Sequence, residues 1–382
     1  MRLSAPATRS DAASCAARLY GQASCATGVS AVGQPLDGKV IDMRRVNVAE
    51  LADGIENGSR AAIARAITLV ESTRPEHRDL AHQLLQRIAP STGAAFRVGI
   101  SGVPGAGKST FINAMGMKLI DERHHRVAVL AVDPSSSRTG GSILGDRTRM
   151  GELAQRQDAF IRPSPSGGHL GGVARATRES MLVLEAAGYD VVLVETVGVG
   201  QSEVAVSGMV DTFLMLQVAR TGDQLQGIKR GILELADVIA ITKADGDNLQ
   251  AARVAARELT IAMKLITSDN EKRRAPVLTC SSYTGDGLDE VWDTVMKHRA
   301  DLEADGTLAT RRLEQQRDWM WNMVRDELME ALRTSPQVRA RAEMVESRLA
   351  EESLSAVEGA SEILAGFAEA VETMPWAARR GE

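Results

Sequence analysis

The chain has 382 residues, 44% hydrophobic and 25% charged, which is long enough for one large core with extensions. Its formal net charge of −5 and aromatic content of 3% argue against nucleic acid bound through a basic face or stacked bases. No apolar run approaches the roughly 20 residues that span a bilayer, so we expect a soluble protein without membrane contact. Three cysteines without metal-ligand spacing are typical of a reducing compartment.

Residues 1–45 differ in composition from the rest of the chain. They are rich in Ala, Ser, Gly and Arg, and Asp11 is the only acidic residue before Asp37. Two interpretations stay open. A disordered bacterial tail, or an over-long start assignment, predicts a cytoplasmic protein, whereas a transit peptide would place it in the mitochondrial matrix.

Residues 46–93 predict an N-terminal helical segment. Their apolar side chains recur near the helical period. They are Leu51, Ile55, Ile63, Ile67, Val70, Leu84, Leu85 and Ile88. Pro90 and Gly93 then break the pattern before the first strand.

A phosphate-binding loop of the pattern G-x-x-x-x-G-K-[ST] occupies Gly102–Ser109. It follows a predicted strand over 96–100 and precedes a predicted helix over 110–120, which is the setting that this loop requires. Lys108 is expected on the β- and γ-phosphates and the Ser109 hydroxyl on Mg²⁺. Backbone N–H groups around the loop would cradle the phosphates. These belong to Gly105, Ala106, Gly107, Lys108, Ser109 and Thr110.

Carboxylates follow the next strands of the alternating pattern. Asp133 ends a predicted strand over 127–132, and Asp146 lies in the glycine-rich stretch beyond it. Glu195 ends the predicted strand 191–195 and opens an E-x-x-G variant of D-x-x-G, in which Gly198 can donate its N–H to the γ-phosphate. Hard oxygens suit Mg²⁺, so Asp133, Asp146 and Glu195 are candidate metal or water-positioning groups.

Further short apolar strands are predicted over 212–218, 238–241 and 277–280, with helices over 174–188 and 249–265. This alternation predicts an α/β fold of the P-loop NTPase kind, with a mostly parallel sheet flanked by helices over 94–305 and helical extensions at both ends. Ligands bind at the carboxyl ends of such strands, which is where the polar motifs fall.

Guanine recognition is indicated by two segments late in that domain. Thr242-Lys243-Ala244-Asp245 fits [NT]-K-x-D, in which the carboxylate accepts hydrogen bonds from N1–H and the 2-amino group of guanine. Lys243 would pack along the base. Ser281 and Ser282 end the last strand, where a backbone N–H can reach guanine O6. The expected ligands are therefore GTP and GDP with Mg²⁺.

Residues 306–382 read as helices only, with a break at Ser335-Pro336. Apolar stripes run along them, which are typical of core packing or of a subunit interface. Trp321, Val324, Leu328 and Leu332 form one stripe; Ile363, Leu364, Phe367 and Val371 form another. We therefore expect a dimerisation extension.

Over roughly residues 47–330 the chain resembles the methylmalonyl-CoA mutase-associated GTPase family, of MeaB/ArgK type. The resemblance is carried by the order of these motifs together with the segments over 162–166, 195–203 and 222–229. The resemblance implies a homodimeric, Mg²⁺-dependent GTPase of slow intrinsic rate. It would act as a chaperone that protects and reloads an adenosylcobalamin-dependent acyl-CoA mutase. It places Ser109, Asp133, Asp146 and Glu195 at the metal and catalytic centre. Asp223, Gln226 and Lys229 would couple nucleotide state to the partner.

Two other functions stay open at this point. One is a kinase or ATPase linked to basic amino-acid transport, which would need an ATP preference that Asp245 opposes. The other is a metal-insertion GTPase, which would usually carry a His- or Cys-rich stretch. Methylmalonyl-CoA, isobutyryl-CoA and other acyl-CoA mutases all remain candidate clients.

Overall fold

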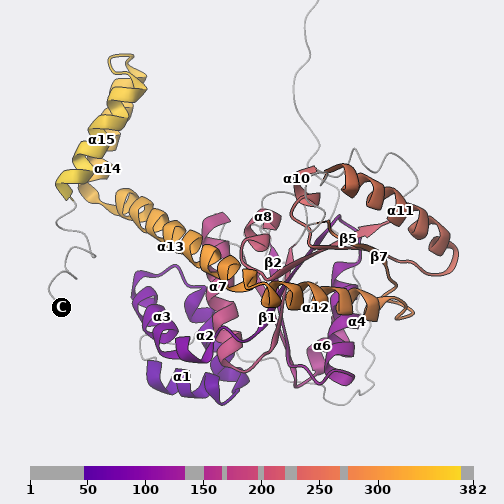
Figure 1. Ribbon diagram of the computed structural model, residues 1–382. Coiled ribbons are helices and arrows are strands. Elements are labelled where there is room, and N and C mark those ends of the chain that lie inside the picture. The colour runs from indigo at the N-terminus through magenta and orange to yellow at the C-terminus, as the bar shows by residue number, and fades with distance from the viewer. Residues whose placement is uncertain are drawn as a thin grey trace, which may run out of the picture. The chain divides into compact units, whose positions relative to one another are not determined.

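A seven-stranded parallel sheet in the order β3-β2-β4-β1-β5-β6-β7 lies at the centre of the fold (Figure 1). The computed structural model describes residues 47–133, 150–165, 170–196, 202–219, 230–266 and 274–370. The strands are β1 (Phe96–Gly102), β2 (Val127–Asp133), β3 (Ala159–Pro165), β4 (Val191–Thr196), β5 (Thr212–Val218), β6 (Val238–Thr242) and β7 (Val277–Thr279).

Six of these strands were predicted, because a strand buried on both faces has few polar positions. Every residue of β4 and β5 is buried. The edge strand β3 was not predicted. It carries Pro163 and Pro165, which cannot donate to a ladder and are tolerated only where one side of the strand needs no partner.

Helices cover both faces of the sheet, as predicted for this fold class. One face packs against α7 (Leu170–Ala186), α8 (Ser202–Ser207) and α11 (Leu249–Ile266), and the other against α4 (Lys108–Asp121) and α12 (Leu288–Ala304). Short α6 (Gly151–Gln155) packs on α4 and β3. The remaining short helices are α10 (Arg230–Leu233), η2 (Ala89–Ser91) and η3 (Gly246–Asn248).

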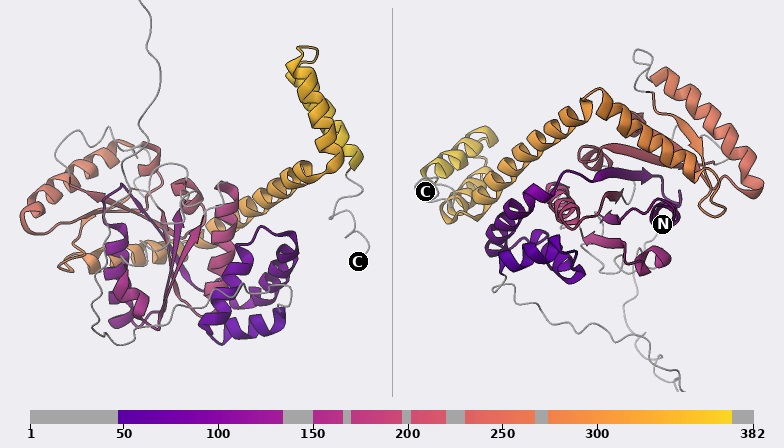
Figure 2. Two further views of the ribbon diagram at one scale, coloured as in Figure 1. Left: turned by 180° about the vertical axis from the view of Figure 1, so that it is seen from behind. Right: turned by 60° about the horizontal axis from the view of Figure 1, so that its bottom comes forward.

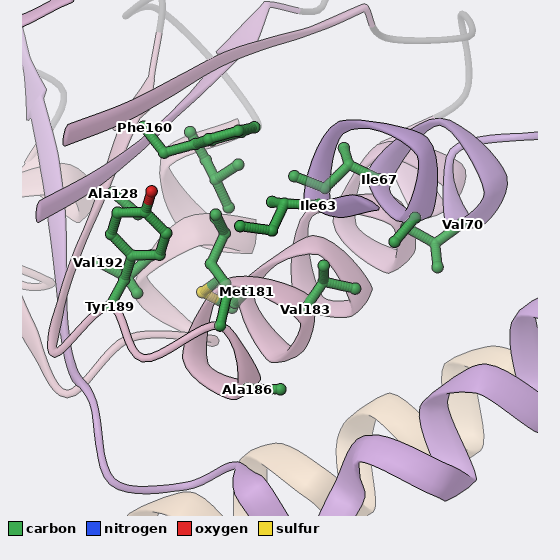
Figure 3. Close-up of a cluster of buried hydrophobic side chains, with 14 of the residues drawn as sticks. Ile63, Ile67, Val70, Ala128, Phe160, Met181, Val183, Ala186, Tyr189 and Val192 are labelled. Carbon is green, nitrogen blue, oxygen red and sulfur yellow. The ribbon is translucent and has the colours of Figure 1, made fainter. Parts of the chain in front are cut away.

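Three N-terminal helices, α1 (Val48–Glu56), α2 (Arg60–Val70) and α3 (Pro75–Ile88), pack on α7 as an outer layer (Figure 1). Ile63 and Ile67 of α2 are fully buried and belong to the same cluster as Met181 of α7 and Phe160 of β3 (Figure 3). The helical segment predicted over 46–93 is thus part of the core on this face of the sheet.

The C-terminal helices are α13 (Thr307–Thr334), α14 (Pro336–Ala350) and α15 (Ala356–Ala370). In the two views of Figure 2, α14 and α15 lie side by side. Gly359 makes this contact close, because a Cβ added there would lie 2.8 Å from a Val345 methyl. None of the helices in the described ranges is long and apolar enough to cross a bilayer.

Candidate nucleotide-binding site

The loop between β1 and α4 has the conformation that its glycines predict. Gly105 and Gly107 have φ angles of 82° and 78°, in the left-handed region that side chains disfavour. At Gly102 a Cβ would lie 2.2 Å from the Leu216 carbonyl oxygen of the neighbouring strand, so only glycine fits. Gly107 caps α4 without a side-chain hydrogen bond, which leaves the first-turn N–H groups to the solvent side or to an anion.

Lys108 lies folded over this loop. Its Nζ donates a hydrogen bond to the Gly102 carbonyl oxygen at 2.9 Å, and the side chain is buried. The ammonium group is thus held within the loop whose N–H groups would cradle an anion. Ala106 is buried in the loop, whereas Thr110 in the first turn of α4 is exposed.

Ser109 and Glu195 come together from α4 and the end of β4. The Ser109 hydroxyl donates to Glu195 Oε1 at 3.0 Å, and both side chains are buried. A hydroxyl and a carboxylate oxygen at the start of the phosphate-loop helix are hard donors of the kind Mg²⁺ prefers. The donor set therefore fits the predicted metal.

Thr242 connects the predicted base-reading loop to the phosphate loop. Its hydroxyl lies 2.7 Å from the Ala106 carbonyl oxygen and 2.9 Å from that of Gln217, so its one proton can serve either acceptor. The threonine hydroxyl therefore connects the two loops at this position of the [NT]-K-x-D motif. Lys243 has a φ angle of 57°. Its side chain passes close to the phosphate loop, because its Cε would lie 3.9 Å from a Cβ added at Gly107.

Asp245 is oriented by Ser281, whose hydroxyl donates to Asp245 Oδ2. Ser281 is fully buried and also accepts from the backbone N–H groups of Tyr283 and Thr284, at 3.2 and 3.1 Å. Ser282 follows in the same turn and is half-buried. The side-chain role of Ser281 was not predicted, because the sequence motif indicated a main-chain contact.

Burial raises the pKa of the neighbouring Cys280 thiol to about 12. The thiol therefore stays protonated near neutral pH, and Cys280 acts as an apolar core residue at the end of β7.

The predicted site residues that the structure describes meet at the carboxyl edge of β1, β4, β6 and β7. Lys108, Ser109, Glu195, Thr242, Lys243, Asp245 and Ser281 are joined there by the contacts above. Asp133 ends β2, on the far side of β4, and its side chain is not described. Asp146, Gly198, Asp223, Gln226 and Lys229 lie outside the described residues.

Two polar residues at strand ends were missed. Gln217 supplies a carbonyl to Thr242, and Thr196 donates to the Ser101 hydroxyl at 2.9 Å. For Thr196 the available signal was a polar residue closing a buried apolar strand next to a ligand-binding edge, whereas the backbone carbonyl of Gln217 has no signature in the sequence.

A parallel sheet with this phosphate loop after β1, a carboxylate at the end of β4 and a K-x-D loop after β6 defines a P-loop NTPase. A solved structure described as a LAO/AO transport system kinase superposes with a TM-score of 0.65 at 39% identity, covering 83% of this chain and 97% of that one.

The family model "Methylmalonyl Co-A mutase-associated GTPase MeaB" matches residues 63–337, so this chain belongs to that family. A probable GTPase of Mycobacterium tuberculosis is 58% identical over 314 residues, which cover 82% of this chain and 93% of that protein. The mouse protein "Methylmalonic aciduria type A homolog, mitochondrial" is 46% identical over 330 residues, covering 84% of this chain and 79% of its own length.

Proposed function

We propose that this protein is a Mg²⁺-dependent GTPase that gates adenosylcobalamin loading and protection of an acyl-CoA mutase of the methylmalonyl-CoA type. The observation that carries the guanine assignment is the Ser281–Asp245 hydrogen bond, which holds an acceptor carboxylate in the K-x-D loop next to the phosphate loop. The family match, whose description names the mutase, supports the partner.

Phosphoryl transfer asks the protein mainly to position groups and to stabilise charge. Lys108 and the first-turn N–H groups of α4 would bind the phosphates. Ser109, Asp133, Asp146 and Glu195 would hold Mg²⁺, which neutralises charge on the phosphate oxygens when it is bound. Asp133 or Glu195 would orient the attacking water, and Gly198 would contact the γ-phosphate.

Base binding is assigned to the second half of the site. Asp245 would accept from guanine, the Lys243 stem would pack along the base, and a backbone N–H of the Ser281–Ser282 turn would reach O6. The Ser281 N–H donates to the Asp286 carbonyl at 2.9 Å, and this bond would help to hold the turn beside the bound base.

A homodimer is the assembly we propose, formed through the C-terminal helices. Trp321 is 60% exposed, and Val324 and Leu328 follow it at helical spacing on the same face of α13. Such an exposed apolar stripe marks an interaction surface more often than a solvated one. Asp223, Gln226 and Lys229 are proposed to relay nucleotide state to the mutase.

The alternative is a kinase or ATPase linked to basic amino-acid transport, because the solved relative is described as a transport system kinase. Ser281 and Asp245 favour guanine over adenine, because adenine lacks both of the donors that the carboxylate would accept from. A cytoplasmic location is proposed, with the mitochondrial matrix as the alternative if residues 1–45 form a transit peptide.

The proposed interaction with the mutase is tested by immobilising this protein with a non-hydrolysable GTP analogue or with GDP and then adding a purified methylmalonyl-CoA mutase. We expect retention of the mutase that differs at least several-fold between the two nucleotides, and slower inactivation of the mutase during turnover. A matched resin carrying Lys108→Ala, which should not bind nucleotide, removes the nucleotide dependence. Equal retention with GTP analogue, GDP and no nucleotide would exclude the gating role.

A further inference from the structure

A pair of buried hydroxyls lies directly behind the site, on the face of the sheet opposite Glu195. Thr196 Oγ1 donates to Ser101 Oγ at 2.9 Å, and the two side chains are 0% and 1% exposed. Ser101 precedes Gly102 of the phosphate loop, and Thr196 follows Glu195. Because side chains alternate along a strand, Thr196 points away from the face that Glu195 shares with Ser109.

The pair joins the two strands that carry the candidate metal ligands. β1 and β4 are parallel neighbours, and the last pair in their register is Ile100 with Glu195. The hydroxyl bond extends this tie by one residue, to the point where both strands enter functional loops. At the end of β1 the Gly102 carbonyl accepts a hydrogen bond from Lys108, and at the end of β4 Glu195 accepts one from Ser109.

Solvent does not reach this pair, because α8 covers the same face. A Cβ added at Gly99, two residues before Ser101, would lie 3.0 Å from a Val206 methyl of α8. β4 is apolar from Val191 to Val194 and turns polar only at its last two residues. A buried hydroxyl is unfavourable unless it is hydrogen-bonded, so the two hydroxyls are tolerated at this depth because they bond to each other.

We propose that Ser101 and Thr196 are positioning residues that set the place of Glu195 relative to the phosphate loop, and so the affinity of the nucleotide complex for Mg²⁺. This assignment rests on the proposed GTPase function. The pair touches neither nucleotide nor metal and acts through the backbone ends of β1 and β4.

The test compares Thr196→Val, Thr196→Ser and Ser101→Ala with the control Thr212→Val. Thr212 is equally buried and its hydroxyl lies 2.8 Å from His298 Nδ1, but at the amino end of β5, away from the site. The readout is the release rate of a fluorescent GDP analogue as a function of Mg²⁺ concentration. Urea unfolding in the absence of nucleotide reports the structural effect of each substitution.

Thr196→Val should raise the Mg²⁺ concentration that half-slows GDP release by about three- to tenfold, the size expected for one lost hydrogen bond. The rate of GDP release from Thr196→Val without Mg²⁺ should stay within about twofold of wild type. Thr196→Ser should show the wild-type Mg²⁺ response. The control Thr212→Val should change only the stability of the protein. If Thr196→Val does not fold, Ser101→Ala decides by the same criterion.

An unchanged Mg²⁺ response in folded Thr196→Val or Ser101→Ala, or an equal change in Thr212→Val, would overturn this assignment while leaving the proposed function intact. If the rate of GDP release from the wild-type protein does not depend on Mg²⁺ concentration, the proposed Mg²⁺-dependent function is wrong, and so is the role of Ser101 and Thr196.

Discussion

At the scale of single residues, side-chain hydrogen bonds connect the loops of the candidate site. Thr242 reaches Ala106 and Gln217, Ser281 reaches Asp245, and Ser109 reaches Glu195. The residue types could be predicted from motif spacing, since phosphate, metal and guanine each need particular groups. Their partners could not, because a backbone carbonyl such as that of Ala106 has no signature in the sequence.

Glu179 of α7 is a buried carboxyl outside the site. Burial raises its pKa from 4.5 to about 7, and this outweighs the opposing effects of Arg175 and Arg78. Arg175 Nε lies 3.4 Å from Glu179 Oε1. The folded protein therefore holds the Glu179 proton more tightly than the unfolded chain does. This stabilisation is complete below about pH 4.5 and is lost as the pH rises toward about 7.

Replacing Glu179 by Gln should remove the loss of stability that ionisation of this carboxyl causes as the pH rises. We expect the variant to gain stability over wild type as the pH rises from about 5 to about 8, reaching about 3 kcal/mol at the upper end. Urea unfolding across this range measures the difference, with exposed Glu290→Gln as the control. A stability difference that stays constant with pH would show that Glu179 is ionised in the folded protein throughout.

At the scale of elements, the beginning of α13 is bound to the amino edge of the sheet. Arg312 donates to both carboxylate oxygens of Asp211, at 2.8 and 2.6 Å, and to the Ala95 carbonyl. Gln315 Nε2 donates to the Val210 carbonyl at 2.8 Å. The first turns of this helix therefore pack against the amino edge of the sheet, at the beginning of the helical extension that the sequence predicts over 306–382.

Arg312→Ala should destabilise the protein by about 3 kcal/mol, because it leaves the fully buried Asp211 without its ion-pair partner. Arg317→Ala, an exposed site on the same helix, should change stability by less than about 0.5 kcal/mol. Chemical denaturation measures both. Equal effects of the two substitutions would mean that the beginning of α13 contributes no more to the stability of the protein than a solvent-exposed helix does.

Among the elements, the long apolar strands were the most predictable from sequence, because burial on both faces removes polar residues from them. β5 has the predicted bounds Thr212–Val218. β3 escaped prediction because Pro163 and Pro165 argue against a strand, and only the sheet order shows that it lies at an edge. Strand order itself depends on long-range pairing that local pattern does not encode.

At the scale of the whole molecule, the exposed apolar stripe on α13 predicts a homodimer that forms through this helix. The double variant Trp321→Glu/Leu328→Glu places two charges in the proposed interface and should convert a dimer into a monomer in sedimentation velocity. Glu330→Lys, which the helical repeat places on the opposite side of α13 from Trp321, should leave the dimer unchanged. A wild-type monomer at micromolar concentration, or a double variant that stays dimeric, would contradict the proposed interface.

Whether this protein prefers guanine nucleotides is decided by calorimetric titration of the full chain with GDP and with ADP in the presence of Mg²⁺. We expect GDP to bind about 100-fold or more tightly than ADP, and Asp245→Asn to lose this preference because an amide donor replaces the carboxylate acceptor. Equal or tighter binding of ADP by the wild-type protein would contradict the guanine preference.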